Sequence, residues 1–196
     1  MANKQSKAEK EFAQSQGWTY TESYSDPQGR TKALKDSLEK VCPKKYFDVS
    51  NIMTVESGRR NVILFGCYFK DRDWGHKQRH GFACLIESDR FGSVGSPVDI
   101  IGGGSFDTHG VLNQVDMGDS EFARNFIVAS KDPALAKRVV TESLQAILLE
   151  GRMKIDDYYE IVIGPGGAVI ITWAYKTNEE YLALVDLARR IESVFE

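Results

Sequence analysis

Two cysteines and two histidines near the middle of the chain are the residues best suited to bind a metal ion. Two thiolates and two imidazoles, from Cys67, Cys84, His76 and His80, would suit a tetrahedral zinc site. The stretch that contains them has two apolar runs around a charged centre, which is typical of a long β-hairpin. On such a hairpin His76 lies at the tip, roughly 25 Å from the mid-strand thiols, and His80 lies roughly 13 Å from Cys84. We therefore predict buried thiols, no metal site and no cofactor.

The same two thiols could also pair with each other. A turn centred near Trp74 and Gly75 places Cys67 opposite Cys84, where a cross-strand disulfide is geometrically feasible. The chain has three cysteines, an odd number that argues against a secreted disulfide scaffold. Free thiols are therefore the favoured state. The sequence places no histidine beside a thiol, so a Cys-His nucleophile is not indicated.

A histidine with nearby carboxylates supports a catalytic alternative. His109 lies close in sequence to Asp107 and Asp116, and a histidine next to a carboxylate can act as a general base. The alternative function is therefore a hydrolase-type enzyme with its site in residues 89–118 around His109. Histidine and aspartate are also common together in solvated loops, and the nearby glycines lack the spacing of a phosphate-binding loop. We favour a non-catalytic role.

The charged centre of the hairpin, residues 70–80, holds the candidate binding residues. It has four lysines and arginines, two aspartates and a tryptophan at the bend. An exposed tryptophan among arginines is typical of a recognition surface, because both residues dominate interface hot spots. The alternative is that the tryptophan folds back onto the protein and the charges only solvate the loop. The candidate residues are Arg72, Trp74, His76 and Arg79.

These residues favour a non-catalytic binding or interaction domain that uses the hairpin tip, a sheet edge or both. The expected partner is another protein or a second copy of the chain. The tip could also stack on single-stranded nucleic acid. The net charge of −3 gives no general attraction to nucleic acid, so nucleic acid is not the expected partner.

The hairpin over residues 61–88 must lie at the centre of a sheet, since both of its faces are apolar. The predicted register places Phe65 opposite Ile86 and Phe69 opposite Phe82, on the same face as the two cysteines. Each face therefore needs another element to cover it. The second face carries Leu64, Gly66, Tyr68, Ala83 and Leu85.

Four segments have the apolar period of an amphipathic helix and would supply the cover. They are residues 6–16, residues 31–41, a segment from Asp132 to Gly151, and a segment from Thr177 to Phe195 that starts with a capping box. Ala8 and Phe12 form the thin apolar stripe of the first segment. Strands are predicted at 18–24, at 46–55 pairing with 62–70, at 98–101, and in a second hairpin of 158–163 and 168–175.

Strands joined by short turns indicate an antiparallel sheet. The predicted fold is therefore α+β: a mainly antiparallel sheet built on two β-hairpins and covered by about four amphipathic helices. The length of 196 residues predicts a single domain, residues 1–196.

The composition is that of a globular protein outside the membrane. Hydrophobic residues make up 42% of the chain and charged residues 27%, which is ordinary for a soluble domain. No apolar run approaches the about 20 residues that a membrane-spanning helix needs. The polar start of the chain does not look like a signal peptide. We expect a cytoplasmic protein without a transmembrane segment.

Several short motifs resemble a broad family of uncharacterised bacterial proteins. They are Gly17-Trp18-Thr19-Tyr20, Asn51-Ile52-Met53, the run Val62–Tyr68, Asp119–Phe122, Asn125–Val128, and Ser130-Lys131-Asp132 before Ala136. The resemblance covers most of the chain and implies an α+β domain of unknown function. Some relatives resemble membrane-anchored proteins, and this chain departs from those in lacking an apolar span. The resemblance supplies no catalytic residues.

Overall fold

Strands and helices occupy most of the residues that the structure describes. The structure, a computed structural model, describes residues 2–22, 29–43, 45–56, 60–71, 79–102, 113–152, 159–172 and 177–195. The strands are β1 (Thr19–Thr21), β2 (Lys45–Glu56), β3 (Arg60–Asp71), β4 (Arg79–Ser88), β5 (Val98–Gly102), β6 (Gln114–Val115), β7 (Phe126–Ala129), β8 (Tyr159–Gly164) and β9 (Gly167–Thr172). The helices are α1 (Ala2–Ser15), α2 (Arg30–Val41), the 3₁₀ helix η1 (Asp89–Ser93), α3 (Glu121–Asn125), α4 (Pro133–Val139), α5 (Glu142–Arg152) and α6 (Asn178–Ser193).

The strands form one nine-stranded sheet in the order β1-β2-β3-β4-β9-β8-β5-β7-β6. Every described pair of neighbouring strands is antiparallel. Both predicted hairpins are present, as β3–β4 and β8–β9, and the β4–β9 pairing joins them at the middle of the sheet. The α+β fold predicted from the sequence is confirmed.

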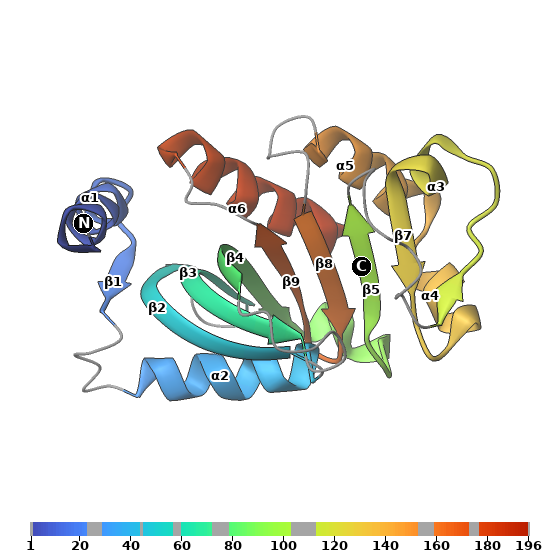
Figure 1. The fold of residues 1–196 in the computed structure, drawn as a ribbon, viewed down its shortest axis with the longest axis horizontal. Coiled ribbons are helices and arrows are strands. Elements are labelled where there is room, and N and C mark those ends of the chain that lie inside the picture. Colours follow the sequence, from blue (N-terminus) through green and yellow to red (C-terminus); the bar gives the residue numbers. More distant parts are fainter. Residues whose placement is uncertain are drawn as a thin grey trace.

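Helices cover both faces of this sheet (Figure 1). On one face α2 buries Leu34, Leu38 and Val41 in a core shared with β2, β3, β4, β8 and β9. On the other face α5 and α6 cover a larger core, to which α1 contributes Phe12 and Ala13. Burial on both faces explains why the central strands are apolar throughout rather than alternating.

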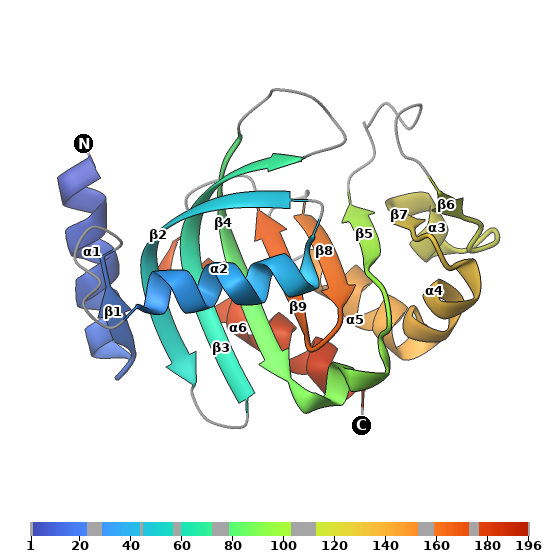
Figure 2. The same ribbon diagram turned by 90° about the horizontal axis from the view of Figure 1, so that it is seen from below.

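The part of the sheet around α2 is strongly curled (Figure 2). Lys45 at the start of β2 forms an ion pair with Glu160 at the start of β8, with Nζ and Oε1 2.8 Å apart. Three strands, β3, β4 and β9, separate β2 from β8 in the sheet order. A direct contact across three strands requires the sheet to bend back on itself, with α2 on its concave side.

The predicted register of the central hairpin is wrong by three residues. Cys84 pairs with Leu64 rather than with Cys67, and Cys67 pairs with Gly81. Because side chains alternate along a strand, an odd shift moves the two thiols to opposite faces. Cys84 lies in the core under α6 and Cys67 in the core under α2. Both faces of these strands are apolar, so the hydrophobic pattern alone does not fix the register.

The segment from Asp132 to Gly151 forms two helices instead of the single predicted one. The break lies at Thr141, whose hydroxyl accepts a hydrogen bond from the Leu144 amide at 3.3 Å and begins α5 as an N-cap would. Gly151 does not end a helix, because it lies inside α5. A Cβ there would be 2.9 Å from Cδ1 of Leu187, so the missing side chain lets α6 approach closely.

Three predicted helices are found, as α1, α2 and α6, although α1 begins at Ala2 and not at residue 6. Gly17, with a φ of 72°, follows α1 as predicted. The capping box at the start of α6 is present in both directions. The hydroxyl of Thr177 accepts from the amide of Glu180 at 3.3 Å, and the carboxylate of Glu180 accepts from the amide of Thr177 at 2.8 Å.

Candidate interaction surface

Three strands project beyond the end of β9 at one side of the sheet (Figure 2). The last pair between β4 and β9 joins Phe82 to Thr172, whereas β3 continues from Gly66, opposite Phe82, to Asp71. This extra length spans roughly 17 Å at about 3.4 Å per residue. We call the projecting part the finger; it consists of residues 45–50, 66–71 and 79–81.

The predicted tip lies at the end of the finger. Arg72, Trp74 and His76 fall outside the described residues, so their exposure stays a prediction. Arg79 is the first residue of β4 and its backbone pairs with Phe69. The structure therefore places the start and end of the 70–80 segment side by side, as a hairpin requires.

Two tyrosines at the base of this tip are exposed to solvent. Tyr46 is 56% exposed and Tyr68 is 46% exposed. Tyr46 pairs with Lys70 and Tyr68 pairs with Asp48, so the two tyrosines are diagonal neighbours on one face of the finger. Tyrosine combines a large apolar ring with a polar hydroxyl, which suits it to protein interfaces.

The position of α6 explains why these rings are exposed. Both lie on the face that α6 covers farther along the sheet, where Leu64 and Phe82 are fully buried. Tyr181, in the first turns of α6, packs on Phe82 with ring centroids 4.5 Å apart. The cover that α6 provides therefore starts near Phe82, and the finger extends past it.

The sequence did not identify this tyrosine pair. It places Tyr68 on a face that needs a cover, and it assigns no role to Tyr46. The available signal was the alternation in β2, in which exposed Tyr46 and Asp48 alternate with buried Phe47 and Val49. That signal indicates which side chains point away from the α2 core. It does not indicate whether a helix covers them on the other face of the sheet.

A buried ion pair joins the far end of the finger to β8. The side chains of Lys45 and Glu160 are only 6% and 9% exposed. Cys42 lies close by, since its carbonyl accepts from the Lys45 amide at 3.0 Å. Burial raises the pKa of Cys42 well above its ordinary value, although the charge of Lys45 acts in the opposite direction. The thiol is therefore protonated near neutral pH and is not a nucleophile.

The other two cysteines are equally unsuited to chemistry. Burial raises the pKa of Cys67 and of Cys84 to about 12. Their positions on opposite faces of the sheet exclude both a disulfide between them and a metal site that they share. Within the described segments, no group of three or more His, Cys, Asp or Glu side chains is placed to hold a metal ion.

The residues of the catalytic alternative are described only in part. His109 and Asp107 lie in 103–112, outside the described residues. Asp116 is exposed, and its Oδ1 accepts a hydrogen bond from the amide of Gly118 at 2.8 Å. This carboxylate stabilises a local turn.

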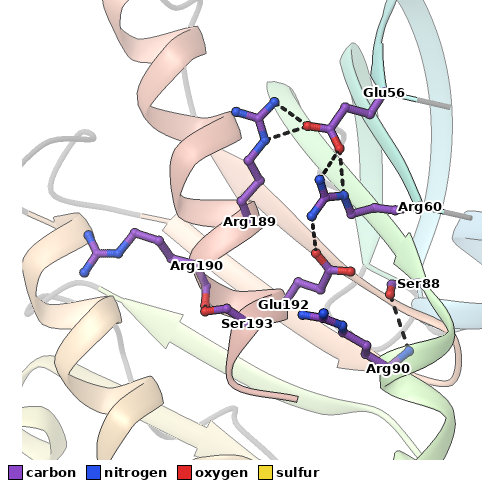
Figure 3. Close-up of polar contacts among 8 residues, drawn as sticks. All are labelled: Glu56, Arg60, Ser88, Arg90, Arg189, Arg190, Glu192 and Ser193. Atoms are coloured by element: carbon purple, nitrogen blue, oxygen red, sulfur yellow. Dashed lines mark hydrogen bonds and ion pairs between the residues drawn. The ribbon is translucent and has the colours of Figure 1, made fainter. Parts of the chain in front are cut away.

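A network of charged side chains lies at the end of β2 and the start of β3, away from the finger (Figure 3). Arg60 donates to Glu56 at 2.6 Å and to Glu192 of α6 at 2.8 Å, and Arg189 also donates to Glu56. Burial acts to raise the pKa of Glu192, but hydrogen bonds from Ser88 and Arg60 and nearby positive charge lower it below its ordinary value. The network links the ends of β2 and β3 to α6.

Comparisons with known proteins extend the description of the fold. No protein-family model and no curated protein sequence matches the chain. The fold is shared with a solved protein. It is similar to the crystal structure of the mycobacterial trehalose monomycolate transport factor A, TtfA, with a TM-score of 0.60 and 12% sequence identity. The match covers 97% of this chain and 93% of TtfA.

At this identity the likeness to TtfA shows a common fold. It extends over nearly the whole of both chains, so it includes the sheet and its helices rather than one motif. In the described segments, no helix is both long and apolar enough to cross a bilayer.

Proposed function

We propose that this chain is a non-catalytic binding domain and that its finger contacts a protein partner. The observation that carries the proposal is the exposed pair of Tyr46 and Tyr68 next to the tip of the hairpin. Tyrosine, tryptophan and arginine dominate interface hot spots. In this proposal Arg72, Trp74, His76 and Arg79 at the tip extend the contact that the tyrosines begin.

The edge of the sheet supports the same role. β1 pairs with β2 only at residues 52–54. Residues 45–50 of β2 pair with β3 on one side, and no strand in the described part of the chain pairs with the other side. An unpaired edge can accept an extended segment of a partner through backbone hydrogen bonds. The proposed contact therefore combines this edge with the tyrosine pair.

Two further observations agree with a non-catalytic role. The three cysteine thiols are buried with raised pKa values, which removes them as nucleophiles. TtfA, whose fold this chain shares, is named as a transport factor, and a role through binding is compatible with that name.

The test is a comparison of partner binding by three variants of the full chain. The first carries Tyr46→Ser with Tyr68→Ser, the second carries Arg72→Ala with Trp74→Ala, and the control carries Leu182→Ser. Leu182 on α6 is 43% exposed and so matches the tyrosines in exposure. Proteins cross-linked to each variant in cells are quantified, and the strongest candidate is then purified and titrated by calorimetry. We expect both finger variants to bind at least about tenfold more weakly than the control.

Equal affinity of the finger variants and the control would contradict the proposal. A shift of nucleic acid in a low-salt gel that disappears in the finger variants would instead assign the finger to nucleic acid. Each variant is compared with the wild type by circular dichroism, so that loss of folding is not mistaken for loss of binding.

A further inference from the structure

In its described part, the N-terminal helix α1 packs on the rest of the chain around a buried carboxylate. Among the described side chains of α1, only Glu9, Phe12 and Ala13 are buried. Ala8, expected from the sequence to join the apolar stripe, is exposed. The apolar part of the contact is therefore even thinner than predicted.

The carboxylate of Glu9 is held by donors from two other elements. Its Oε2 accepts from the amide nitrogen of Asn51 at 2.8 Å, and its Oε1 accepts from the hydroxyl of Tyr181 at 3.1 Å. Asn51 lies at a bulge in β2 with a φ of 50°, in the left-handed region that asparagine tolerates. The backbone there thus presents the Asn51 side chain towards α1.

Phe12 fills an aromatic site one turn farther along the helix. Its ring lies 5.4 Å from the ring of Trp18 in an edge-on arrangement and 5.7 Å from the ring of Tyr181. Tyr181 therefore contacts both Glu9, through its hydroxyl, and Phe12, through its ring. We call the surface formed by Trp18, Asn51 and Tyr181 the α1 site.

Besides Glu9 and Phe12, α1 is held by the hydroxyl of Ser6, which is hydrogen-bonded to the hydroxyl of Tyr20 at 2.9 Å and donates to Oδ1 of Asn51 at 3.4 Å. The helix has 14 residues, and an isolated helix of about this length is marginal in water. Its C-terminal end is capped through Gly17, which has a φ of 72° and is followed by Trp18, whose amide donates to the carbonyl of Ala13 at 2.8 Å. Among the side chains described for residues 6–15, the buried apolar ones are Phe12 and Ala13, and an element with few buried apolar contacts opens at a lower free energy than the central strands.

We propose that α1 is displaceable and that the α1 site binds an amphipathic helix of a partner protein that carries a carboxylate three residues before a phenylalanine. The partner chemistry follows from α1, whose Glu9 and Phe12 show what the site accepts. Asn51 and Tyr181 offer two donors to a carboxylate, and the faces of Tyr181 and Trp18 accept an aromatic ring. The site would recognise a helix in this position by the side chains on one of its faces, which are spaced three and four residues apart. The inference is independent of the finger.

The test uses a fluorescent peptide of residues 1–17 and the full chain, measured by fluorescence anisotropy. Weakening the resident helix by Phe12→Ala in the full chain raises the fraction of open sites, so the apparent affinity for the added peptide rises in proportion. We expect the wild-type peptide to bind the Phe12→Ala chain at least about tenfold more tightly than it binds the wild-type chain.

Two altered peptides test the role of the carboxylate. Glu9→Gln places an amide nitrogen where both neighbouring groups are donors, so this peptide should bind the Phe12→Ala chain about tenfold more weakly than the wild-type peptide. Glu11→Gln is the matched control. Glu11 is 65% exposed and contacts only Lys7 among the described ion pairs, so its replacement should leave binding unchanged.

Failure of the wild-type peptide to bind a folded Phe12→Ala chain would overturn the proposal. Hydrogen exchange on the wild-type chain decides the case if that variant does not fold. Amides of α1 that exchange much faster than those of α6 support displacement, and equal rates overturn it. A concentration-dependent dimer that Glu9→Gln abolishes would assign the site to a second copy of the chain and so overturn the partner assignment.

Discussion

The ion pair of Lys45 and Glu160 shows how single side chains position the finger. Both groups are buried, and burial makes each charge depend on the other. Removing one partner leaves the other charge in a poorly hydrated place, whereas removing both takes away the two charges together. The two kinds of change therefore have different consequences for stability.

We expect Glu160→Gln to lower the free energy of unfolding by about 3–5 kcal/mol, because it leaves the Lys45 ammonium without its carboxylate. The double variant Lys45→Met with Glu160→Leu should be more stable than Glu160→Gln, since the Lys45 charge is removed together with that of Glu160. Urea denaturation of the full chain measures both values. A double variant that is less stable than the single variant would show that the pair itself, rather than the cost of an isolated charge, stabilises the finger.

Predictions for single residues were correct where they depended only on whether the side chain is buried. Cys67 and Cys84 are buried thiols, as expected. The exposure of Tyr46 and Tyr68 was not predictable in the same way, because it depends on where α6 begins to cover the sheet. That boundary is set by contacts between segments about 100 residues apart in the chain, such as Phe82 with Tyr181.

At the scale of elements, the turn between β8 and β9 docks against the end of α2. A Cβ at Gly164 would lie 2.6 Å from the carbonyl oxygen of Val41. In the turn and its flanks only Gly166 has a positive φ angle, at 79°. Gly164 is instead required by the close approach of a helix.

Gly164→Ala should therefore destabilise the chain by about 1–3 kcal/mol, since the helix end must move to make room for the methyl group. Gly95→Ala is the control, because a methyl group on Gly95 would meet no atom within 4 Å apart from its own chain neighbours. Thermal and urea unfolding of the two variants measure the difference. Equal stabilities would mean that α2 adjusts without cost.

Most helices and strands were predictable from the sequence. The break between α4 and α5 and the pairing of β3 with β4 were not. The apolar period of 31–41 and the capping box at Thr177 each locate a helix correctly. The break at Thr141 interrupts a segment whose apolar residues look continuous, although the step from Val139 to Leu144 is five residues and departs from the helical period. The predicted register of the hairpin is wrong for a related reason. When both faces of a strand are apolar, the hydrophobic pattern does not determine which residues of the neighbouring strand pair with it.

At the scale of the whole molecule, the charges around Glu192 connect the sheet to α6. The lowered pKa of Glu192 means that its charged form is stabilised by folding. Stability from this group is therefore present above its unfolded pKa, near 4.5, and is lost as the pH falls through the lower folded value. The stabilisation that the network provides should therefore decrease in acid and be fully present at neutral pH.

We expect Glu192→Gln to cost about 1 kcal/mol at neutral pH, because Arg60 is 40% exposed and water partly replaces the carboxylate. The difference from the wild type should shrink as the pH falls below about 4.5. Urea denaturation across this pH range measures it. Glu150→Gln, which removes a more exposed ion pair with Arg190, is the control and should change stability less. A difference that stays constant with pH would contradict the assignment.

The placement of Cys67 and Cys84 on opposite sides of one hairpin gives the chain a built-in pair of reporters. Each thiol is sealed by a different layer, Cys84 by the layer that contains α6 and Cys67 by the layer that contains α2. A thiol reagent that modifies one cysteine before the other reveals which layer parts from the sheet first. The opening of the α6 layer and the opening of the α2 layer can thus be followed separately through natural cysteines, without an added label.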